Sequence, residues 1–534
     1  MQHFSGGIMN LGYRAGLLAF LILFLSRIAT AADIPRFDVN RYQVEGNSIL
    51  SATEIERTLA PFTGKESDFG TLQQAVEALE HLYRSRGYHA VKVLLPEQEL
   101  KGGVVRVTVF EARIGTVTVE GNSHFDSANI RRSVPKLQEG TVPDLDRISM
   151  NLRVANENPS KKVQMVLQGG DSKDTTNAQL KVTDEKPWKA GVTLDDTGSS
   201  HTGSLRLGFS LQHSNLFNRD HQATFQYTIS PEKIDKVNIF NFAYRIPLYA
   251  LGDSIDFYAG YSDVDSGMVQ SGVLGLNVSG KGTYTGIRYN YNLPRVGGYE
   301  HRILFGIDYR RFENSIDYAG TPLGTITEAI PVSIGYAATM AFGGGTEISG
   351  WAALSQNIPG GDKGETADYH KVRTGSYADF TILRAGTTAV YVFPADVQGR
   401  FTVSGQYAWM PLIPGEQFGM GGQGSIRGFG ERELADDMGL AGSLEIYSPN
   451  ILKLLNLSGS QLKALAFYDA GYMERNKPQP GETEFRNAAS TGVGLRLGID
   501  KYLSASTDYA IVVGPQGTHS SGSGRWHFKV NVMF

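Results

Sequence analysis

The sequence predicts an all-β transmembrane barrel of about 16 antiparallel strands that follows two small α+β domains. Three observations lead to this prediction. The chain starts with the pattern of an export signal, a repeat of mixed helix and strand character follows, and the remainder alternates apolar and polar residues. The composition agrees, because 63 glycines, 25 tyrosines and 26 phenylalanines in 534 residues favour β structure over helix bundles.

The N-terminal segment has the parts of a secretory signal peptide. Arg14 precedes an apolar run from Ala15 to Leu25, and the small residues from Ala29 to Ala32 offer a cleavage site. A membrane-anchor helix is the alternative, but this run is short for crossing a bilayer. We therefore expect residues 1–31 to be a signal peptide, and no long apolar run follows it that would predict a transmembrane helix.

The composition also argues against several kinds of site. There is no cysteine, so disulfides, thiolate nucleophiles and cysteine metal sites are impossible. The net charge of −4 and the absence of a lysine/arginine block argue against nucleic-acid binding. The 11 histidines show no metal-ligand spacing, and no G-x-S-x-G or H-E-x-x-H motif occurs. We expect no enzyme, no cofactor and no metal site.

A repeat identifies the two small domains. The motif "VEGNS" occurs at Val44 to Ser48 and again at Val119 to Ser123, an offset of 119 − 44 = 75 residues. A period of this length is that of a small domain rather than of a solenoid unit. We expect the first domain at residues 37–113 and the second at residues 114–186, each with the order strand, helix, helix, strand, strand.

Local signals support this order in both copies. Ser51 and Glu54 predict a capping box that opens a helix running to Leu59. The other predicted elements of the first copy are a strand through Tyr42 and Val44, a helix from Thr71 to Arg86, and strands at Val91 to Leu95 and Val104 to Phe110. In the second copy they are a helix through Leu145, Ile148, Leu152 and Ala155, and strands at Val163 to Leu167 and Ala178 to Val182. Such modules either offer a sheet edge to a guest strand or act as inert spacers.

From Trp188 onward, alternation of period two replaces helical spacing. In "TGIRYNYNL", Thr285, Ile287, Tyr289, Tyr291 and Leu293 share one face, and Gly286, Arg288, Asn290 and Asn292 share the other. In "RILFGIDYR", Ile303, Phe305, Ile307 and Tyr309 are expected to point outward. An aromatic apolar face opposite a polar face suits a barrel wall between lipid and water, although a soluble sandwich also alternates. Residues 188–534 number 347, which allows about 16 strands of about 22 residues with their connections.

The last ten residues, "RWHFKVNVMF", predict a terminal barrel strand. Its apolar face would hold Trp526, Phe528, Val530, Val532 and Phe534, and its polar face Arg525, His527, Lys529 and Asn531. Upstream, "GSIRGFGERE" from Gly424 to Glu433 places an apolar residue, a cation and an aromatic ring in a glycine-rich stretch that forms neither a good strand nor a good helix.

Taken together, these features resemble the Omp85 superfamily of outer-membrane proteins. Within it the chain is most similar to the TpsB transporters of two-partner secretion, the haemolysin and filamentous-haemagglutinin secretion proteins of the ShlB/FhaC/HecB type. The two modules resemble polypeptide-transport-associated (POTRA) domains. The resemblance also rests on three segments: Pro96 to Gly115 between the modules, Leu194 to His221 at the start of the barrel, and "FYDAGY" from Phe467 to Tyr472.

The resemblance implies a role for the glycine-rich stretch. A long extracellular loop, around residues 415–440, would fold back into the barrel, with Ile426, Arg427, Gly428 and Phe429 at its tip. Its partner on the inner wall would be the motif of Phe467, Asp469 and Gly471, which period-two alternation places on one face. A guanidinium can bind a carboxylate through two hydrogen bonds. Some relatives carry an N-terminal plug helix, and too few residues precede the first module here for one to be expected.

The resemblance also implies a function. The protein would lie in the bacterial outer membrane with its POTRA domains in the periplasm, after insertion by the barrel-assembly machinery. It would bind an unfolded exoprotein of haemolysin or adhesin type through POTRA sheet edges and pass it through the lumen. An outer-membrane protein insertase of the same superfamily is the alternative, although two modules are fewer than such proteins usually have. A diffusion porin needs neither the modules nor a folded-in loop.

Overall fold

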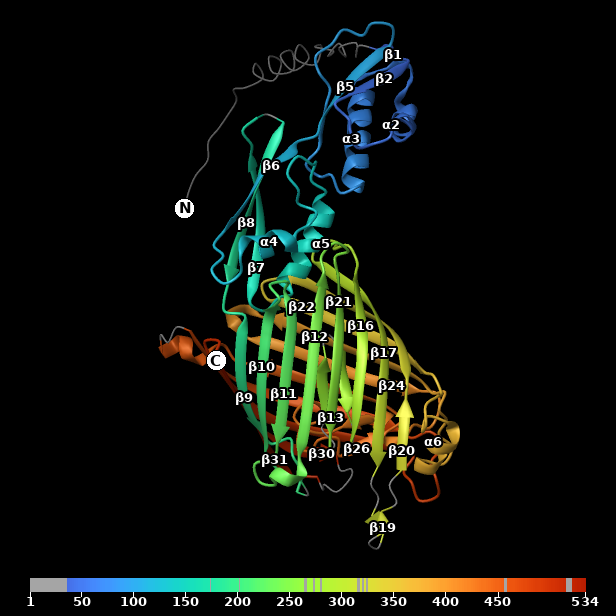
Figure 1. The fold of residues 1–534 in the computed structure, drawn as a ribbon, viewed down its shortest axis with the longest axis vertical. Coiled ribbons are helices and arrows are strands. Elements are labelled where there is room, and N and C mark those ends of the chain that lie inside the picture. The colour runs from blue at the N-terminus through green and yellow to red at the C-terminus, as the bar shows by residue number, and fades with distance from the viewer. Residues whose placement is uncertain are drawn as a thin grey trace, which may run out of the picture. The chain divides into compact units, whose positions relative to one another are not determined.

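The computed structural model describes residues 36–534 except 173, 201, 264–266, 272–273, 279–280, 315–316, 319–320, 323–324, 456–458 and 515–520. The expected signal peptide, residues 1–31, lies outside the described residues. The chain divides into two compact units (Figure 1). One contains the residues up to Arg113 together with Ser172–Thr175, and the other contains Ile114–Asp171 and Thr176–Phe534.

The first unit is the first module. Its elements are β1 (Phe37–Val39), β2 (Arg41–Glu45), α2 (Ala52–Leu59), η1 (Ala60–Phe62), β3 (Gly64–Ser67), α3 (Phe69–Ser85), β4 (Lys92–Leu94) and β5 (Val104–Phe110). The strands form a sheet of order β2-β5-β4 and a separate β1-β3 pair. The capping box of Ser51 and Glu54 is confirmed. Helix α3 starts two residues earlier than predicted, because the carboxylate of Asp68 accepts the backbone N–H of Thr71 at 2.8 Å and caps it there.

The second module has the predicted order of strand, helix, helix, strand and strand, and its described residues form no counterpart of the β1-β3 pair. Its elements are β6 (Arg113–Glu120), α4 (Ser127–Ser133), α5 (Leu145–Asn156), β7 (Lys161–Gly169) and β8 (Thr175–Asp184), with the sheet order β6-β8-β7. Ile130 and Ile148 of the helices are buried with Val163 and Leu180 of the sheet in one apolar cluster. The module therefore has its own core, as its hydrophobic periodicity predicts.

The repeated glycine has the same structural role in both modules. Gly46 and Gly121 both have φ of +83°. A Cβ on Gly46 would lie 2.3 Å from the carbonyl oxygen of Val109, and one on Gly121 would lie 2.4 Å from that of Val182. Only glycine tolerates both the positive φ and this close backbone approach. The "VEGNS" repeat thus marks the same turn against the last strand of each module.

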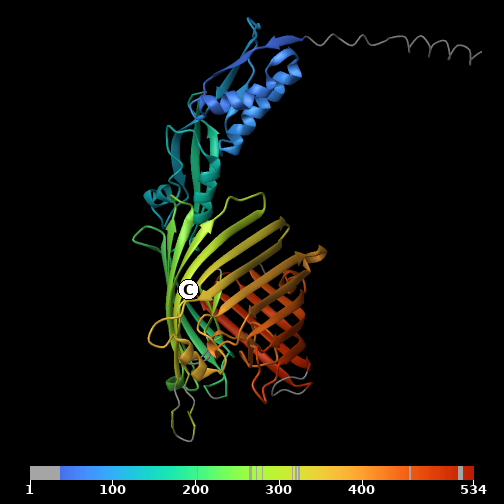
Figure 2. The same cartoon turned by 90° about the vertical axis from the view of Figure 1, so that its right-hand side faces the viewer.

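The rest of the second unit is a closed antiparallel barrel with 16 strand positions (Figures 1 and 2). Its strands are β9 (Trp188–Asp195), β10 (Arg206–Leu216), β11 (His221–Ile229), β12 (Asn238–Leu248), β13 (Asp253–Ser262), β16 (Lys281–Asn292), β17 (Tyr299–Asn314), β20 (Thr325–Ala329), β21 (Pro331–Gly343), β22 (Thr346–Asn357), β23 (Thr381–Val392), β24 (Gln398–Ala408), β27 (Met438–Tyr447), β28 (Ser460–Glu474), β29 (Phe485–Ile499), β30 (Leu503–Gly514) and β31 (Gly524–Met533). Strands β20 and β21 both pair with β17, one after the other, and share one position. The predicted fold class is confirmed.

Shorter elements lie in the connections between barrel strands. They are η2 (Ile234–Lys236), β14 (Gly267–Ser271), β15 (Leu274–Val278), β18 (Asp317–Tyr318), β19 (Thr321–Pro322), α6 (Thr366–Val372), η3 (Pro394–Asp396), η4 (Pro414–Glu416), β25 (Phe418–Met420), β26 (Leu434–Asp436) and η5 (Ile451–Leu455). These elements are too short to show a hydrophobic pattern in the sequence, so they were not predicted from it.

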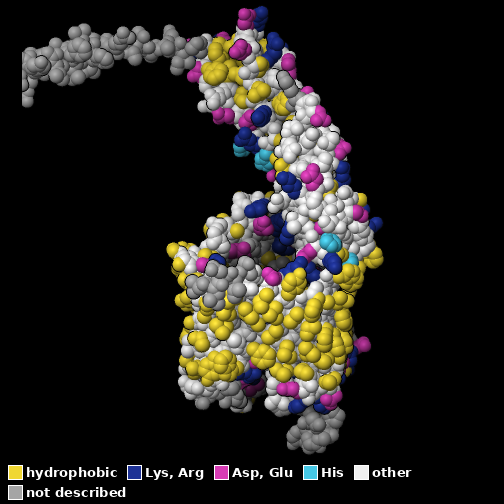
Figure 3. Space-filling view, turned by 90° about the vertical axis from the view of Figure 1, so that its left-hand side faces the viewer, with side chains coloured by type: hydrophobic (Ala, Val, Ile, Leu, Met, Phe, Trp, Pro, Cys, Tyr) yellow, Lys and Arg dark blue, Asp and Glu magenta, His cyan; other side chains and the backbone are white. Residues whose placement is uncertain are grey.

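The predicted alternation determines which side chains face outward. On β16, Ile287 and Tyr291 are exposed, whereas Arg288 and Asn290 between them are buried inside the barrel. Figure 3 shows the result as a broad band of hydrophobic side chains across the face of the outer wall that it draws. An apolar outer band and a polar interior are the requirements for a barrel that spans a membrane.

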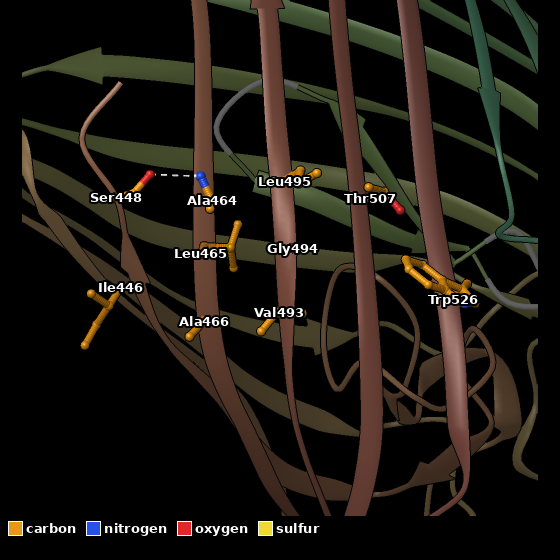
Figure 4. A pocket seen from close by; sticks show the side chains of 10 residues that line it. All are labelled: Ile446, Ser448, Ala464, Leu465, Ala466, Val493, Gly494, Leu495, Thr507 and Trp526. Atoms are coloured by element: carbon orange, nitrogen blue, oxygen red, sulfur yellow. Dashed lines mark hydrogen bonds between the residues drawn. The ribbon is translucent and has the colours of Figure 1, made fainter. Parts of the chain in front are cut away.

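A shallow groove of about 490 Å³ crosses this outer wall between β27 and β31 (Figure 4). Ala464 and Ala466 on β28 are small, and the larger Ile446, Val493 and Trp526 flank them. Its apolar lining suits lipid acyl chains, as expected for a membrane-facing surface.

The terminal strand closes the barrel. Strand β31 pairs with β9 through five residue pairs, from Lys529 opposite Asp195 to Met533 opposite Gly191, whereas β28 and β29 share fifteen. Trp526 points outward with 64% of its surface exposed, and His527 points inward and is 2% exposed. The backbone pairing between the first and last strands is thus short. Side-chain contacts near this junction also help to hold the two strands together.

Candidate functional site

A long connection between β24 and β27, residues 409–437, returns into the barrel. Its strands β25 and β26 pair antiparallel, with Phe418 opposite Asp436, so the segment is a hairpin whose tip lies between them. Ile426 and Phe429 at this tip are fully buried, and Arg427 is nearly so. The tip contacts inward-facing residues of the wall, as described below, and we call residues 409–437 the folded-in loop.

Arg427 is the centre of these contacts. Its Nε and Nη2 donate to the two carboxylate oxygens of Asp469, each at 2.7 Å. Its Nη1 donates to Glu445 Oε1 at 2.8 Å, and Nη2 also donates to Ser443 Oγ at 2.9 Å. The guanidinium carbon lies 3.4 Å from the centroid of the Phe467 ring, which adds a cation–π contact. Both the edge and the face of the guanidinium therefore have partners on β27 and β28.

The charges around Arg427 form a buried cluster. Asp508 on β30 lies 3.8 Å from Arg427 Nη1 and pairs with Arg496 through two hydrogen bonds of 2.7 and 2.9 Å. Asp469 and Asp508 are fully buried. Buried carboxylates are costly unless cations and hydrogen bonds compensate them. Arg427 therefore supplies the positive charge that faces Asp469, and it adds to the compensation of Asp508 by Arg496.

Apolar side chains seat the loop beside this cluster. Ile426 and Phe429 are buried with Phe418, Met420 and Leu434 of the loop and with Ala441, Met473, Ala488 and Val512 of the wall. A Cβ on Gly471 would lie 2.1 Å from Met420 Sδ, so the glycine leaves the space that Met420 occupies. In this motif, the ring of Phe467 and the carboxylate of Asp469 contact the loop. Gly471 has no side chain and so leaves room for Met420.

The backbone of the tip is also held. Gly428 has φ of +95°, and its N–H donates to Nε2 of His527 at 3.0 Å. Since Nε2 accepts, it carries no proton in this arrangement. The other ring nitrogen, Nδ1, lies 3.1 Å from Asp196 Oδ2, directly after β9. His527 therefore links the loop tip to both strands of the closing junction.

Three acidic residues anchor the two ends of the folded-in loop. Glu416 accepts from Arg310 on β17 at 2.8 and 2.9 Å and from Arg384 on β23 at 3.1 Å. At the other end, Asp436 accepts from Arg475 at 2.7 Å. Asp437 accepts from both Nη groups of Arg373, after α6. These anchors could not be predicted from the sequence, because single acidic residues in a loop have no distinguishing pattern.

A second polar cluster joins the second module to the barrel. Lys161 Nζ donates to Asp220 Oδ2 at 2.5 Å and to Asn129 Oδ1 at 2.9 Å. Asp220 lies in the turn between β10 and β11 and also accepts from the hydroxyl of Tyr249 at 2.6 Å. The side chains of Lys161 and Asp220 are buried, and burial lowers the pKa of Lys161 although Asp220 opposes this effect.

Helix α5 supplies further bonds to the same end of the barrel. Arg153 donates to the backbone carbonyls of Leu293 and His301 at 3.0 and 3.1 Å and to Asn292 Oδ1 at 3.0 Å. Asn151 Nδ2 donates to the carbonyl of Tyr249 at 2.6 Å. The module is thus bonded to three successive strand connections of the barrel. The sequence offered no signal for this contact.

The described residues include neither a membrane-spanning helix nor a cluster of metal ligands. No helix in this part of the chain is both long and apolar enough to cross a membrane. Over the same residues, no group of three or more His, Asp or Glu side chains is placed to hold a metal ion. The charged residues described above form ion pairs and hydrogen bonds with one another.

Comparison with known proteins identifies the family. Residues 174–497 match the family described as haemolysin secretion/activation protein ShlB/FhaC/HecB, and residues 37–112 match the ShlB-type POTRA domain. The outer membrane transporter CdiB of Escherichia coli is 24% identical over 466 residues, covering 87% of this chain and 77% of that protein. The heme/hemopexin transporter HuxB of Haemophilus influenzae is 23% identical over 191 residues, covering 34% of this chain and 33% of that protein.

Solved structures agree at the level of the fold. CdiB from Escherichia coli matches with a TM-score of 0.74 at 20% identity, covering 99% of this chain and 100% of that one. BamA from Haemophilus ducreyi lacking POTRA domains 1–3 matches with a TM-score of 0.50 at 14% identity, covering 93% and 100%. The barrel therefore lies in the bacterial outer membrane, with the POTRA region in the periplasm. The chain belongs to the ShlB/FhaC/HecB haemolysin secretion/activation family, the two-partner secretion transporters of the Omp85 superfamily.

Proposed function

We propose that this transporter exports one large exoprotein of haemolysin or adhesin type, which reaches it unfolded in the periplasm. The observation that carries the proposal is the folded-in loop. Arg427 holds it inside a closed barrel through a defined cluster of wall charges. A lumen that is occupied by an anchored segment suits a conduit for one macromolecular partner better than an open diffusion pore.

The POTRA modules are the proposed binding site for the exoprotein. Sheet edges present unpaired backbone groups to which an extended segment can add as a further strand. Strand β2 lies at one edge of the first module's sheet, and β6 and β7 lie at the edges of the second. The side chains beside these edges would then choose among segments, while the main chain supplies affinity.

We also propose that the motif at the loop tip and its wall partners hold the resting state. Ile426, Arg427, Gly428 and Phe429 would have to be released, at least in part, for a chain to pass. The motif of Phe467, Asp469 and Gly471 would be the seat from which they leave. Folding of the exoprotein outside the cell is the proposed driving force, since the sequence has no G-x-x-x-x-G-K-[ST] stretch for a nucleotide.

A comparison of two proteomes, with the gene deleted and intact, tests the proposal. We expect one large protein to disappear from the culture medium while outer-membrane barrel proteins remain at normal levels. A broad loss of barrel proteins from the outer membrane would instead indicate an insertase and would overturn the proposal. Complementation with the intact gene should restore the secreted protein and is the control.

A further inference from the structure

The periplasmic half of the barrel interior is hollow. Two cavities of about 580 and 350 Å³ lie there, and both are lined by Thr388 on β23. Their lining residues belong to the ends of the strands opposite the folded-in loop. For example, Arg400 is near the start of β24 and the loop leaves that strand at its other end. We call these two neighbouring cavities together the antechamber.

Six cationic side chains line the antechamber: Arg153, Arg302, Arg400, Lys463, Arg496 and Lys529. Only one acidic residue, Glu300, lines it with them. Period-two alternation places a second acid, Glu347, on the same inner face of β22, and Asp396 at the rim pairs with Lys463. Basic side chains therefore outnumber acidic ones on this surface.

Two of these cations, Arg400 and Arg496, pair with acidic residues that are much less exposed than they are. The side chain of Arg400 is 45% exposed, whereas that of its partner Glu445 is 9% exposed. Arg496 is 28% exposed, and its partner Asp508 is fully buried. Glu445 and Asp508 also belong to the cluster around Arg427. Around Arg400 and Arg496 the charge that meets water is consequently positive, whereas Glu300 and Asp396 are the exposed partners of Arg153 and Lys463.

Lys529 adds to this field without a counter-ion. It is exposed on the inner face of β31, and no ion pair joins it to another of the residues that the structure describes. A concave surface of one sign within low-dielectric walls focuses the field and raises the local concentration of the opposite charge. Rings of charged side chains select permeant species in the same way.

The uncharged part of the lining combines apolar residues, namely Val390, Tyr447 and Leu497 in one cavity and Trp351 in the other, with small and hydroxylated ones. Thr339, Ser349, Ser504 and Ser506 contribute hydroxyl groups, and Gly386 leaves the wall without a side chain. Such a surface offers hydrogen bonds to a peptide backbone and contacts to apolar side chains. A lining in which charged, hydroxyl and apolar groups lie side by side suits an extended polypeptide better than a small molecule, whose sites are mostly apolar with few polar groups.

We infer that the antechamber receives acidic segments of an unfolded polypeptide in preference to basic ones. The inference rests on the proposed function, because it takes the ligand to be a passenger chain. It deepens that function by assigning a charge preference to the periplasmic part of the lumen, ahead of the folded-in loop.

Binding of two labelled peptides to the purified full-length chain in a zwitterionic detergent tests this inference. The peptides have equal length and differ only in carrying glutamate or lysine between serine and glycine residues. At low salt the acidic peptide should bind at least about tenfold more tightly, and this preference should shrink as salt screens the charges. Equal binding of the two peptides would overturn the inference.

Substitutions in the lining of the antechamber test whether the peptide binds there. Combined Arg400→Gln and Lys529→Gln should weaken binding of the acidic peptide severalfold, and Arg400→Glu with Lys529→Glu should abolish the preference. Lys236→Glu, on the exposed η2 between β11 and β12, is the matched control and should leave binding unchanged. Unaltered binding by both lining variants would refute the antechamber as the site. The assay is independent of the proteome comparison, so failure of the charge preference and failure of the proposed function are distinguishable.

Discussion

Arg427 at the loop tip and Asp469 on β28 share two hydrogen bonds of 2.7 Å, although 42 residues separate them in the sequence. The pair lies in a buried cluster to which Glu445 and Asp508 also belong. The position of the loop therefore determines whether the guanidinium of Arg427 lies among the carboxylates of the wall. Displacing the tip would leave Asp469 without this guanidinium, whereas Asp508 would keep Arg496 and Glu445 would keep Arg400.

Arg427→Ala should impair secretion while the barrel still inserts into the outer membrane. Removing one partner of a buried ion pair costs about 3–5 kcal/mol, because the other charge remains buried without compensation. We expect a lower unfolding temperature of the extracted barrel on gels and less exoprotein in the medium. Arg84→Ala, which removes an exposed pair with Glu80, should change neither measurement. Normal secretion by Arg427→Ala would exclude the loop contact from the mechanism.

Substitution of His527 should loosen the loop tip if the new side chain cannot accept a hydrogen bond, and should loosen it less if the side chain can. His527→Phe removes the acceptor for the N–H of Gly428 and leaves a buried donor unsatisfied, which costs about 1–3 kcal/mol. His527→Gln retains an acceptor oxygen at a similar reach. In planar bilayers we expect His527→Phe to open more often than His527→Gln. Identical opening frequencies for both variants would show that this bond does not restrain the loop.

The buried pair of Lys161 and Asp220 should show strong coupling between the second module and the barrel. Lys161→Met alone leaves the Asp220 carboxylate buried, and the expected loss of stability is about 3–5 kcal/mol. Adding Asp220→Asn should recover most of this loss, because no uncompensated charge then remains. Hydrogen exchange of α4 and β7 in the full-length chain measures both effects. Additive losses in the double variant would contradict the coupling.

Gly121→Ala should destabilise the second module much more than Gly140→Ala. Both glycines have positive φ, +83° and +79°. The Cβ of an alanine at position 121 would lie 2.4 Å from the carbonyl oxygen of Val182, whereas nothing lies within 4 Å at position 140. We expect a cost of about 1 kcal/mol at Gly140 and at least about 3 kcal/mol at Gly121. Proteolysis of the module in the full-length chain measures this difference, and equal susceptibility would contradict the clash.

Acid should destabilise the second module through Asp184. Burial would raise the pKa of this carboxyl, but the backbone N–H groups of His124, Phe125 and Ser123 outweigh burial and lower the pKa below its usual 3.8. A depressed pKa contributes stability above the unfolded value, and this contribution is lost as pH falls through the folded value. Hydrogen exchange in the full-length chain should therefore show weaker protection of the module below about pH 4. In Asp184→Asn the protection should be lower at neutral pH and should change less on acidification.

The sequence by itself determined the elements whose signals are local. Alternation in β16 and β31 specifies which residues face lipid, because successive strand residues point to opposite sides. The Ser51–Glu54 capping box and the repeated Gly46 and Gly121 mark element boundaries through bonds and φ angles within a few residues. These signals, with the resemblance to a known family, led to the barrel, the two modules and the residues of the loop motif.

Only the tertiary structure decided the contacts between distant segments. Nothing near Glu416 in the sequence indicates Arg310 and Arg384, and nothing near Lys161 indicates Asp220. The bond from Gly428 to His527 likewise depends on where the loop lies and on the register of the last strand. The local pattern specifies the face of a strand on which a side chain lies. Which residue it contacts depends on the closure of the barrel and the path of the loop, because these bring distant faces together.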